Sequence, residues 1–275
     1  MRPAMILRVV VFALAAFVLN FPVIATAVTA LKSGAEIVRN PGLTVADPTL
    51  ENFAAVFAGT GQLDIWGYLT NSLVAAMIGT LLPMALCFPA AWAMARRDVG
   101  LGVLFPVAVN LRALPLIIFA IPIYLMYQVL GLLDTRLGLG LILTVVNVPI
   151  ALLILVNTIH ALPVELDEAA YMDGARTFTL LRRVVLPLSR PAFATIFVFG
   201  FVTAWNEFLF GLMLTTKEAV PVTVGASFFF ATAGGGVQWG VAAAVILVAA
   251  APPMLLGLFA YRYIGASMAA GAIKG

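Results

Sequence analysis

Two ionisable side chains that fall inside apolar stretches are the first candidates for chemistry in this sequence. Arg112 and Glu207 lie in otherwise apolar runs, and Trp205 and Asn206 directly precede the glutamate. A charge inside a bilayer is costly enough to suggest a functional site by default. We predict that Arg112 and Glu207 pair, directly or through water, and that all four side chains border the pathway of a hydrophilic solute. A purely structural ion pair that locks two helices is the alternative.

The sequence gives no support for a metal site or for a catalytic nucleophile. The chain has one cysteine, Cys87, and one histidine, His160, so it offers neither a disulfide framework nor a Cys/His metal site. An enzyme within the membrane would need a catalytic cluster, and His160 has no evident nucleophile or metal partner. We therefore expect no catalytic residue, no metal site and no cofactor on this chain.

Charged residues gather in the segment 161–190, between two apolar stretches. Pro163 suits the first turn of a helix, where its missing N–H removes no hydrogen bond. Three carboxylates follow in that turn, namely Glu165, Asp167 and Glu168. The positive end of the helix dipole favours carboxylates there. Asp173 and Gly174 can end this helix, because glycine accepts a positive φ without steric cost.

A second short helix is predicted to follow the glycine. Thr177 can cap its amino end. Arg182 and Arg183 lie near its carboxyl end, where cations are favourable, and Pro187 is expected to stop it. The segment is therefore predicted to form a helix–turn–helix held against the membrane.

Composition places most of the chain in lipid. Hydrophobic residues make up 63% of the 275 positions and charged residues 10%, against about 45–50% and about 25% in soluble domains. A helix needs about 20 mostly apolar residues to cross the hydrocarbon core. We predict an all-α integral membrane protein, a single domain over residues 1–275, with six transmembrane helices at about 9–31, 73–95, 102–130, 138–159, 191–214 and 240–263.

The distribution of lysine and arginine predicts the orientation. Cytoplasmic loops of membrane proteins carry an excess of both residues. A cytoplasmic amino terminus places most of them inside, including those of the segment 161–190, and leaves outside only Lys32, Arg39, Arg136 and Lys217. Both termini are therefore predicted to be cytoplasmic, with an external loop over 32–70. The external residues 225–239 suggest either a re-entrant loop or an interfacial aromatic belt.

The first apolar run has an alternative interpretation as a secretory signal. Arg2 and Arg8 precede the run, and Ala25-Thr26-Ala27 follows it, as in a cleavage site. Cleavage there would leave five spans and an amino terminus outside. We retain the run as a transmembrane helix.

The segment 161–190 resembles the EAA loop of permeases in binding-protein-dependent ABC importers. The match comprises Glu168-Ala169-Ala170, three residues, Gly174, nine residues, Val184, one residue and Leu186-Pro187. The family usually has isoleucine where Val184 stands. Four further features resemble the carbohydrate (maltose-type, CUT1-like) branch: Asn71-Ser72-Leu73, Gly131 to Thr135, Trp205 to Phe208 and Gly271 to Gly275.

The resemblance implies a permease subunit of an importer for a sugar or polyol. The EAA helix would be a coupling helix that seats in a groove of a cytoplasmic ATPase and transmits its closure to the spans. Ala169 and Ala170 would let the backbones approach, Glu168 would pair with a basic group of the ATPase, and Gly174 would allow the turn. Asp173, Leu186 and Pro187 complete the implied coupling residues. An amphipathic segment resting on lipid headgroups is the alternative.

The resemblance also implies the partners. They are a second permease subunit, two copies of the ATPase and an extracytoplasmic solute-binding protein, assembled at a bacterial cytoplasmic (inner) membrane. ATP and magnesium would bind the ATPase, since the sequence Gly-x-x-x-x-Gly-Lys-Ser/Thr is absent from this chain. The tail that ends in Lys274 and Gly275 is a second implied ATPase contact. A net charge of only +3 gives no reason to expect nucleic acid.

An ion-coupled secondary transporter of a small hydrophilic solute is the alternative function. Such transporters usually show inverted repeats and several buried carboxylates, whereas Glu207 stands alone in its span. The sequence does not identify the solute, because small differences in hydrogen bonding choose among sugars and polyols.

Overall fold

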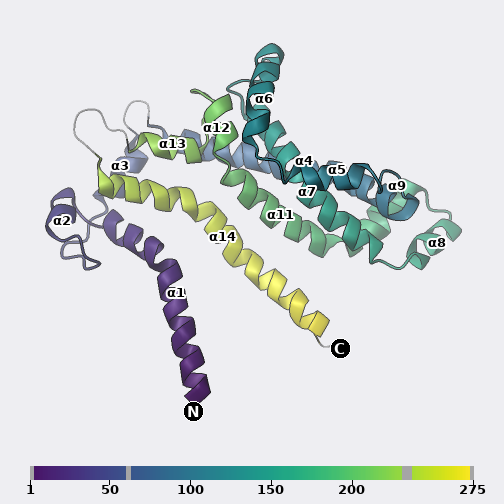
Figure 1. The fold of residues 1–275 in the computed structure, drawn as a ribbon, viewed down its shortest axis with the longest axis horizontal. Helices are drawn as coiled ribbons and strands as arrows, with labels where there is room; N and C mark the ends of the chain where they lie inside the picture. Colours follow the sequence, from purple (N-terminus) through teal and green to yellow (C-terminus); the bar gives the residue numbers. More distant parts are fainter. Residues whose placement is uncertain (1–2, 60–62, 231–236, 273–275) are drawn as a thin grey trace. The chain divides into compact units, whose positions relative to one another are not determined.

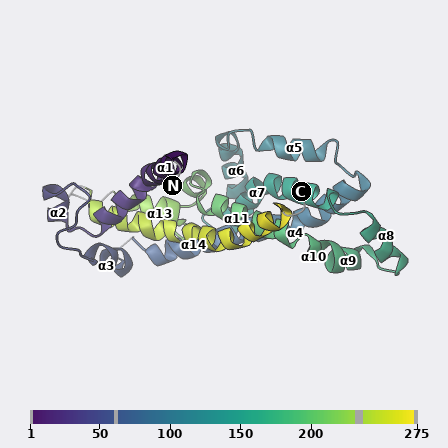
Figure 2. The same ribbon diagram turned by 90° about the horizontal axis from the view of Figure 1, so that it is seen from below.

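A computed structural model describes residues 3–59, 63–230 and 237–272, and all regular secondary structure in these ranges is helical (Figures 1 and 2). The all-α class is therefore confirmed. The elements are α1 (Pro3–Ala30), α2 (Gly34–Arg39), α3 (Glu51–Ala58), α4 (Ile65–Arg97), α5 (Leu104–Leu111), α6 (Ile117–Leu130), α7 (Arg136–His160), α8 (Glu165–Met172), α9 (Thr177–Leu180), the π-helical turn η1 (Leu181–Val185), α10 (Leu186–Leu188), α11 (Arg190–Trp205), α12 (Leu209–Leu214), α13 (Val222–Phe228) and α14 (Trp239–Ala272).

In the described chain, 4 helical segments are long and apolar enough to cross a membrane: Leu7–Ala30, Ile65–Arg97, Arg136–His160 and Trp239–Ala260. The helical stretch Thr177–Leu188 and α11 together would make a fifth, although they are bent by 74° relative to each other. Helix α6 is apolar but shorter. Length and composition thus support four or five spans, and the count of six stays a prediction.

The third apolar stretch, 102–130, is not one continuous helix. It is broken between α5 and α6, over residues 112–116. Pro115 has no backbone N–H, and its ring disfavours helical geometry at the preceding residue. The backbone therefore turns at this point, and Arg112 does not lie inside one continuous helix.

The fifth stretch, 191–214, is also broken, at residues 206–208 between α11 and α12. The side chain of Glu207 accepts hydrogen bonds from the backbone N–H groups of Phe210 and Gly211. These groups lie in the first turn of α12, where backbone donors have no partner within the helix. The glutamate thus stabilises a new helix start in the middle of the stretch.

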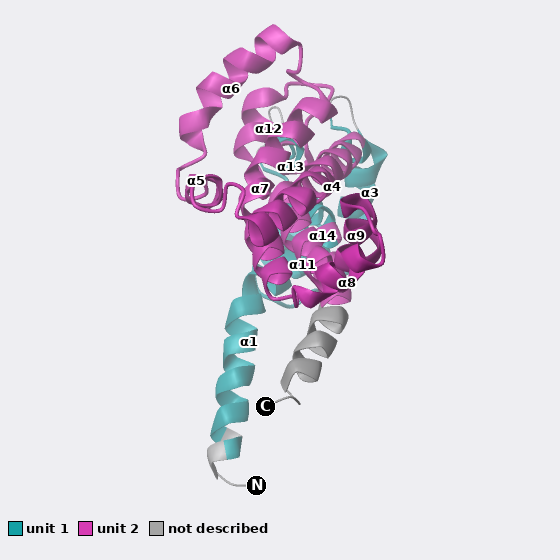
Figure 3. Ribbon diagram, turned by 90° about the vertical axis from the view of Figure 1, so that its right-hand side faces the viewer, with its two compact units in different colours: residues 1–66, 225–251 teal, residues 67–224, 252–275 magenta. Residues whose placement is uncertain are grey.

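The chain divides into two compact units, which Figure 3 shows in different colours. The first comprises Met1–Trp66 and Gly225–Ala251, and the second comprises Gly67–Val224 and Pro252–Gly275. In the first unit, Asn52 of α3 donates hydrogen bonds from Nδ2 to the carbonyls of Ala30 and Lys32, both at 2.8 Å. These bonds hold α3 against the end of α1.

In the second unit, glycines allow α4 and α7 to pack closely. A Cβ added at Gly79 would lie 2.5 Å from Cβ of Leu143, and one added at Gly140 would lie 2.7 Å from Cβ of Ile78. Helices in lipid associate mainly through such close packing, because the surrounding acyl chains are as apolar as the helices. Side chains at the two glycine positions would force α4 and α7 apart.

A buried asparagine joins three helices of the second unit. Pro83 has no N–H, so the carbonyl of Gly79, four residues earlier in α4, lacks its usual helical donor. Nδ2 of Asn147 in α7 donates to that carbonyl at 2.9 Å and to the carbonyl of Gly200 in α11 at 3.0 Å. Asn147 is only 1% exposed. Its amide therefore supplies the donor that the proline removes and links α4, α7 and α11.

Candidate functional site

Helix α8 ends in a motif that sets the direction of the following chain. Gly174 has a φ of +80°, which a residue with a Cβ rarely adopts. Its N–H bonds to the carbonyl of Tyr171 at 3.0 Å, and the N–H of Ala175 bonds to the carbonyl of Ala170 at 2.9 Å. This pair of bonds is the Schellman arrangement. The turn at Asp173 and Gly174 is therefore a defined reversal between α8 and α9.

The inner face of α8 is fastened to the end of α4 by a buried ion pair. Nε of Arg96 lies 3.0 Å from Oδ2 of Asp167, and the two side chains are 7% and 8% exposed. Nε1 of Trp92 donates to the same oxygen at 3.2 Å, and Nη2 of Arg96 donates to the carbonyl of Leu162 at 2.9 Å. Breaking a buried pair of this kind by removing one partner typically costs about 3–5 kcal/mol. We call Trp92, Arg96 and Asp167 the inner clamp.

The opposite face of α8 is open to solvent. Glu168 and Ala169 are exposed, and Met172 is 88% exposed. Phe178 of α9 is 72% exposed. Ala170, three residues after Asp167, packs instead against the core of the second unit. The helix thus presents carboxylate and apolar side chains outward from a firmly held inner face.

The second helix of the segment differs from its predicted form. Thr177 is the first residue of α9 and makes no capping hydrogen bond, because Arg176 occupies the cap position. Pro187 does not stop the helical path, which runs through η1 and α10 to Leu188. The wider π turn ends at the residue before α10, so Pro187 lies in the first turn of that helix, where its missing N–H is tolerated.

A hollow of about 490 Å³ lies beside the glycine turn. Its lining includes the charged residues Arg176, Arg183 and Asp173, together with Ala170, Gly174, Ala175, Thr179, Leu180 and Val184. Of the residues predicted for coupling, Ala170, Asp173 and Gly174 therefore border one concave surface. Leu186 and Pro187 are half-buried and do not line it.

Three of the residues predicted for a solute pathway, Trp205, Asn206 and Glu207, lie in different surroundings. Trp205 is 3% exposed and stacks on Phe201, with 5.5 Å between ring centroids. Asn206 is exposed at the end of α11. Glu207 is half-buried, and its carboxylate is used to cap α12, at 3.0 Å from the N–H of Phe210. These observations place the three consecutive residues in three different surroundings.

The predicted ion pair between Arg112 and Glu207 is not formed. Within the described residues, ion pairs join Arg96 to Asp167 and Lys217 to Glu218. Arg112 is exposed at the end of α5, in the break before Pro115. The two residues were predicted to lie in two continuous helices, and both stretches are interrupted. Lys274 and Gly275 lie outside the described residues, as do Gly234 to Gly236 of the predicted external loop.

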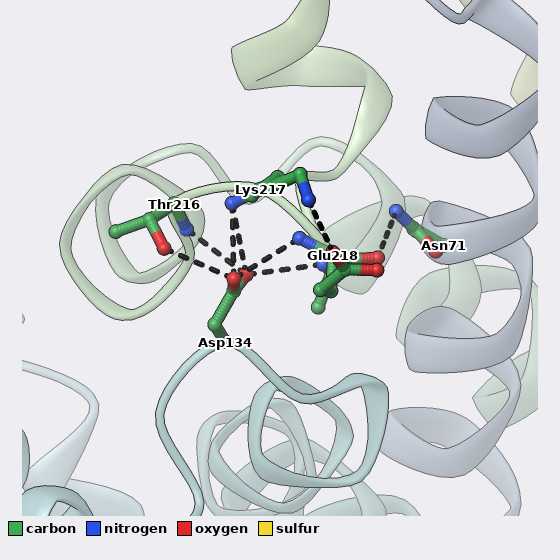
Figure 4. Close-up of polar contacts among 6 residues, drawn as sticks. Asn71, Asp134, Thr216, Lys217 and Glu218 are labelled. Atoms are coloured by element: carbon green, nitrogen blue, oxygen red, sulfur yellow. Dashed lines mark hydrogen bonds and ion pairs between the residues drawn. The ribbon is translucent and has the colours of Figure 1, made fainter.

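A second polar network joins segments that are distant in the sequence (Figure 4). The carboxylate of Asp134 accepts hydrogen bonds from four consecutive backbone N–H groups, those of residues 216–219, at 3.0 to 3.2 Å. Nδ2 of Asn71 in α4 donates to the carbonyls of Glu218 and Val220, at 3.1 and 2.9 Å. Nε of Arg136 donates to Oδ1 of Asn71 at 2.6 Å. The loop between α12 and α13 is thus held at both its N–H and its carbonyl groups.

The charge of Asp134 is stabilised by this loop. Desolvation alone would raise the pKa of the carboxyl group, but the backbone N–H groups of Glu218, Thr216, Ala219 and Lys217 outweigh it and lower the pKa to about 2. Hydrogen bonds to the charged form of an acid favour that form. Asp134 therefore acts as an ionised anchor over the whole physiological pH range.

Sequence reasoning missed the inner clamp, although signals for it exist. Asp167 precedes the inward-facing Ala170 by three residues and so lies on the same side of α8. Trp92 and Arg96 are four residues apart in α4 and share a face in the same way. Two periodic patterns can indicate inward faces, but only the folded chain shows that these two faces meet.

Comparisons with known proteins identify relatives of this chain. Residues 85–270 match the family model described as binding-protein-dependent transport system inner membrane component. The chain is 31% identical over 272 residues to the trehalose/maltose transport system permease protein MalG of Thermococcus litoralis, which covers 98% of this chain and 97% of that protein. It is 30% identical over 241 residues to the trehalose transport system permease protein SugB of Mycobacterium tuberculosis, covering 86% of each.

A solved structure shares the fold. It is the crystal structure of a bacterial ABC transporter involved in the import of the acidic polysaccharide alginate, one chain of which superposes with a TM-score of 0.79 at 22% identity. The superposition covers 95% of this chain and 96% of that chain. At this identity the likeness concerns the fold alone.

Proposed function

The chain belongs to the family of binding-protein-dependent transport system inner membrane components, and from this premise we propose that it is a permease subunit of an ATP-driven importer for a sugar or polyol. The relatives named as trehalose/maltose and trehalose permeases support a carbohydrate as solute. The subunit is not itself an enzyme. ATP and magnesium bind separate ATPase subunits, which supply the energy for transport.

The observation that carries the proposal is the segment 165–188, which lies inside the matched residues 85–270. Its first helix is anchored on one face and exposes Glu168, Ala169 and Met172 on the other. An exposed surface that combines a carboxylate with large apolar side chains is suited to a protein partner. We assign this outer face to the groove of the ATPase.

The assembly follows from this assignment. Six spans with both termini in the cytoplasm place α8 and α9 on the inner side of the membrane and the loop between α12 and α13 outside. A second permease completes the pathway, two ATPase copies dock on the coupling segments, and a binding protein delivers the solute from outside. Closure of the ATPases moves α8, and the spans alternate between inward-open and outward-open arrangements.

The test is co-purification of the tagged chain from its native membrane, followed by mass spectrometry and reconstitution in liposomes. We expect a second multi-span permease and a P-loop ATPase in the purified complex, and sugar uptake that requires Mg²⁺ and ATP. A chain that purified alone and transported without ATP would contradict the importer and support an ion-coupled transporter.

The same experiment tests the coupling segment. Gly174→Leu is expected to lower recovery of the ATPase, because a Cβ at a φ of +80° is strained and shifts the turn after α8. Gly257→Leu is a matched control, since an added Cβ at that exposed helical position meets no atom within 4 Å. Equal losses from both substitutions would point to a general folding defect.

A further inference from the structure

Helix α4 carries a polar attachment at each of its ends within the second unit. At its carboxyl end, Trp92 and Arg96 hold Asp167 of α8 through the inner clamp. Arg96 also holds the carbonyl of Leu162, which precedes α8. Motion of the first turn of α8 is therefore opposed by three hydrogen bonds to one end of α4.

The amino-terminal part of α4 carries a comparable attachment, which we call the outer clamp and define as Asn71 and Ser72. Asn71 donates to the carbonyls of Glu218 and Val220, and Oγ of Ser72 accepts the N–H of Val222 at 2.8 Å. Both residues are 3% exposed. The loop 215–222 is therefore bound to α4 through main-chain atoms, so these bonds do not depend on the loop's own side chains.

The spacing of the two clamps along α4 allows them to lie at opposite faces of a membrane. From Asn71 to Arg96 the helix advances about 38 Å at 1.5 Å per residue. The hydrocarbon core is about 30 Å thick, so both polar attachments can lie at its boundaries while the apolar residues between them cross it. Helix α4 remains helical through Pro83 and Pro89, and Asn147 replaces the donor lost at Pro83.

We propose that α4 couples the ATPase-docking helix α8 to the loop 215–222 on the other side of the membrane, with Asp167 and Asn71 as positioning residues at its two ends. The inference rests on the proposed function, because it requires an ATPase at α8. When α8 is displaced, the buried carboxylate of Asp167 moves Arg96 and with it the end of α4. The shift of α4, along or across its axis, is passed to the loop by the hydrogen bonds of Asn71. The return route is equivalent, since coupling between two sites is reciprocal.

The test places a reporter on the loop and changes each clamp separately. In a Cys87→Ala background, Lys217→Cys introduces one thiol at an exposed position whose backbone N–H still bonds to Asp134. The complete purified complex in nanodiscs is treated with a water-soluble maleimide, with and without Mg-ATP and orthovanadate. The measured quantity is the ratio of the two modification rates.

We expect Mg-ATP and orthovanadate to change the rate of maleimide modification in the reference complex. In Asp167→Asn and in Asn71→Leu, this nucleotide-dependent change should be smaller by about fivefold or more. The double variant should lose no more of this nucleotide-dependent change than either single variant, because both substitutions interrupt the same connection through α4. Asp98→Asn is the matched control for charge. It removes an exposed carboxylate just beyond α4, at a φ of 55° that asparagine tolerates, and should leave the ratio unchanged.

ATPase recovery and ATP hydrolysis separate this inference from the proposed function. If the reference complex contains no ATPase, the proposed function fails. If the ATPase is present and active, but the loop does not respond or either clamp variant responds normally, the role of α4 is overturned. Should Asp167→Asn fail to assemble, Trp92→Phe removes one donor to the carboxylate while keeping a ring, and must reduce the ratio for the inference to stand.

Discussion

Asp134 and Glu218 are 84 positions apart in the sequence, yet Oδ2 of Asp134 accepts the backbone N–H of Glu218 at 3.0 Å. The same carboxylate accepts three neighbouring N–H groups, those of Thr216, Lys217 and Ala219. A single side chain thus holds the N–H groups of four consecutive residues in the loop between α12 and α13. The following predictions test this anchor and the other interactions that hold the second unit together.

Asp134→Ala is expected to destabilise the protein by about 1–3 kcal/mol, because four backbone donors lose a charged acceptor. The measurement is thermal unfolding in detergent, followed by tryptophan fluorescence. Lys217→Ala is the control, since the exposed ion pair of Lys217 with Glu218 contributes little. A variant at position 134 as stable as this control would show that the loop holds its shape without the carboxylate.

The same anchor predicts a dependence of stability on pH. The pKa of Asp134 is lowered from 3.8 to about 2 in the folded chain, so its contribution is complete above about pH 5 and is lost as the pH falls through the folded pKa. Asp134→Asn cannot titrate and should remove this part of the acid sensitivity. Unfolding curves of the two proteins should therefore converge toward pH 2. Parallel curves over the whole interval would contradict an ionised anchor.

The turn after α8 should tolerate asparagine better than any β-branched residue. Gly174 has a φ of +80°, and an added Cβ meets no atom within 4 Å, so the cost is conformational and not steric. Gly174→Val is expected to cost about 1–2 kcal/mol and to weaken ATPase binding, whereas Gly174→Asn should cost less. Co-purification measures how much ATPase each of the two variants retains. Equal recovery of the ATPase with Gly174→Val and with Gly174→Asn would argue against strain at this turn.

Close packing between α4 and α7 predicts intolerance of a single methyl group. Gly79→Ala places a Cβ 2.5 Å from Cβ of Leu143 and should destabilise the protein by about 1–3 kcal/mol. Gly257→Ala, in a helix with open space around it, should cause no loss. Thermal unfolding of both variants is the measurement. A stable Gly79→Ala protein would mean that the two helices can move apart at little cost.

The amide of Asn147 should be required for the junction of α4, α7 and α11. Asn147→Leu removes the donor to the carbonyls of Gly79 and Gly200 in a site that is 1% exposed. Leaving the buried carbonyl of Gly79, which has no helical donor because of Pro83, without a partner typically costs about 1–3 kcal/mol. The variant should unfold at a lower temperature than Asn157→Leu, a control at an exposed position of the same helix.

Arg112 and Glu207 are expected to respond differently to substitution. Glu207→Ala removes the acceptor that caps α12 and should lower stability by about 1–2 kcal/mol, while Glu207→Gln retains an acceptor oxygen and should lose less. Arg112→Met should leave stability and assembly unchanged, because the arginine is exposed and forms no ion pair with Glu207, but should impair sugar uptake. Normal uptake by Arg112→Met would exclude it from the solute pathway.

The amino-acid sequence by itself determined the helical class, the membrane location and the family. Lipid exposure requires long apolar runs, and the pattern that resembles the EAA loop lies within about 20 consecutive residues, from Glu168 to Pro187. The end of α8 could also be predicted from the sequence, because the positive φ that the turn requires at Gly174 depends on local backbone geometry alone.

Only the tertiary structure decided which polar groups meet. Arg112 and Glu207 form no direct ion pair, and each lies at a break in its apolar stretch, before Pro115 and before α12. The pair that does form, Arg96 with Asp167, joins residues whose separation in the sequence is 71. Hydropathy is a sum over neighbouring residues, whereas the choice of a hydrogen-bond partner depends on helix rotation and on distances that are defined only once the helices have packed.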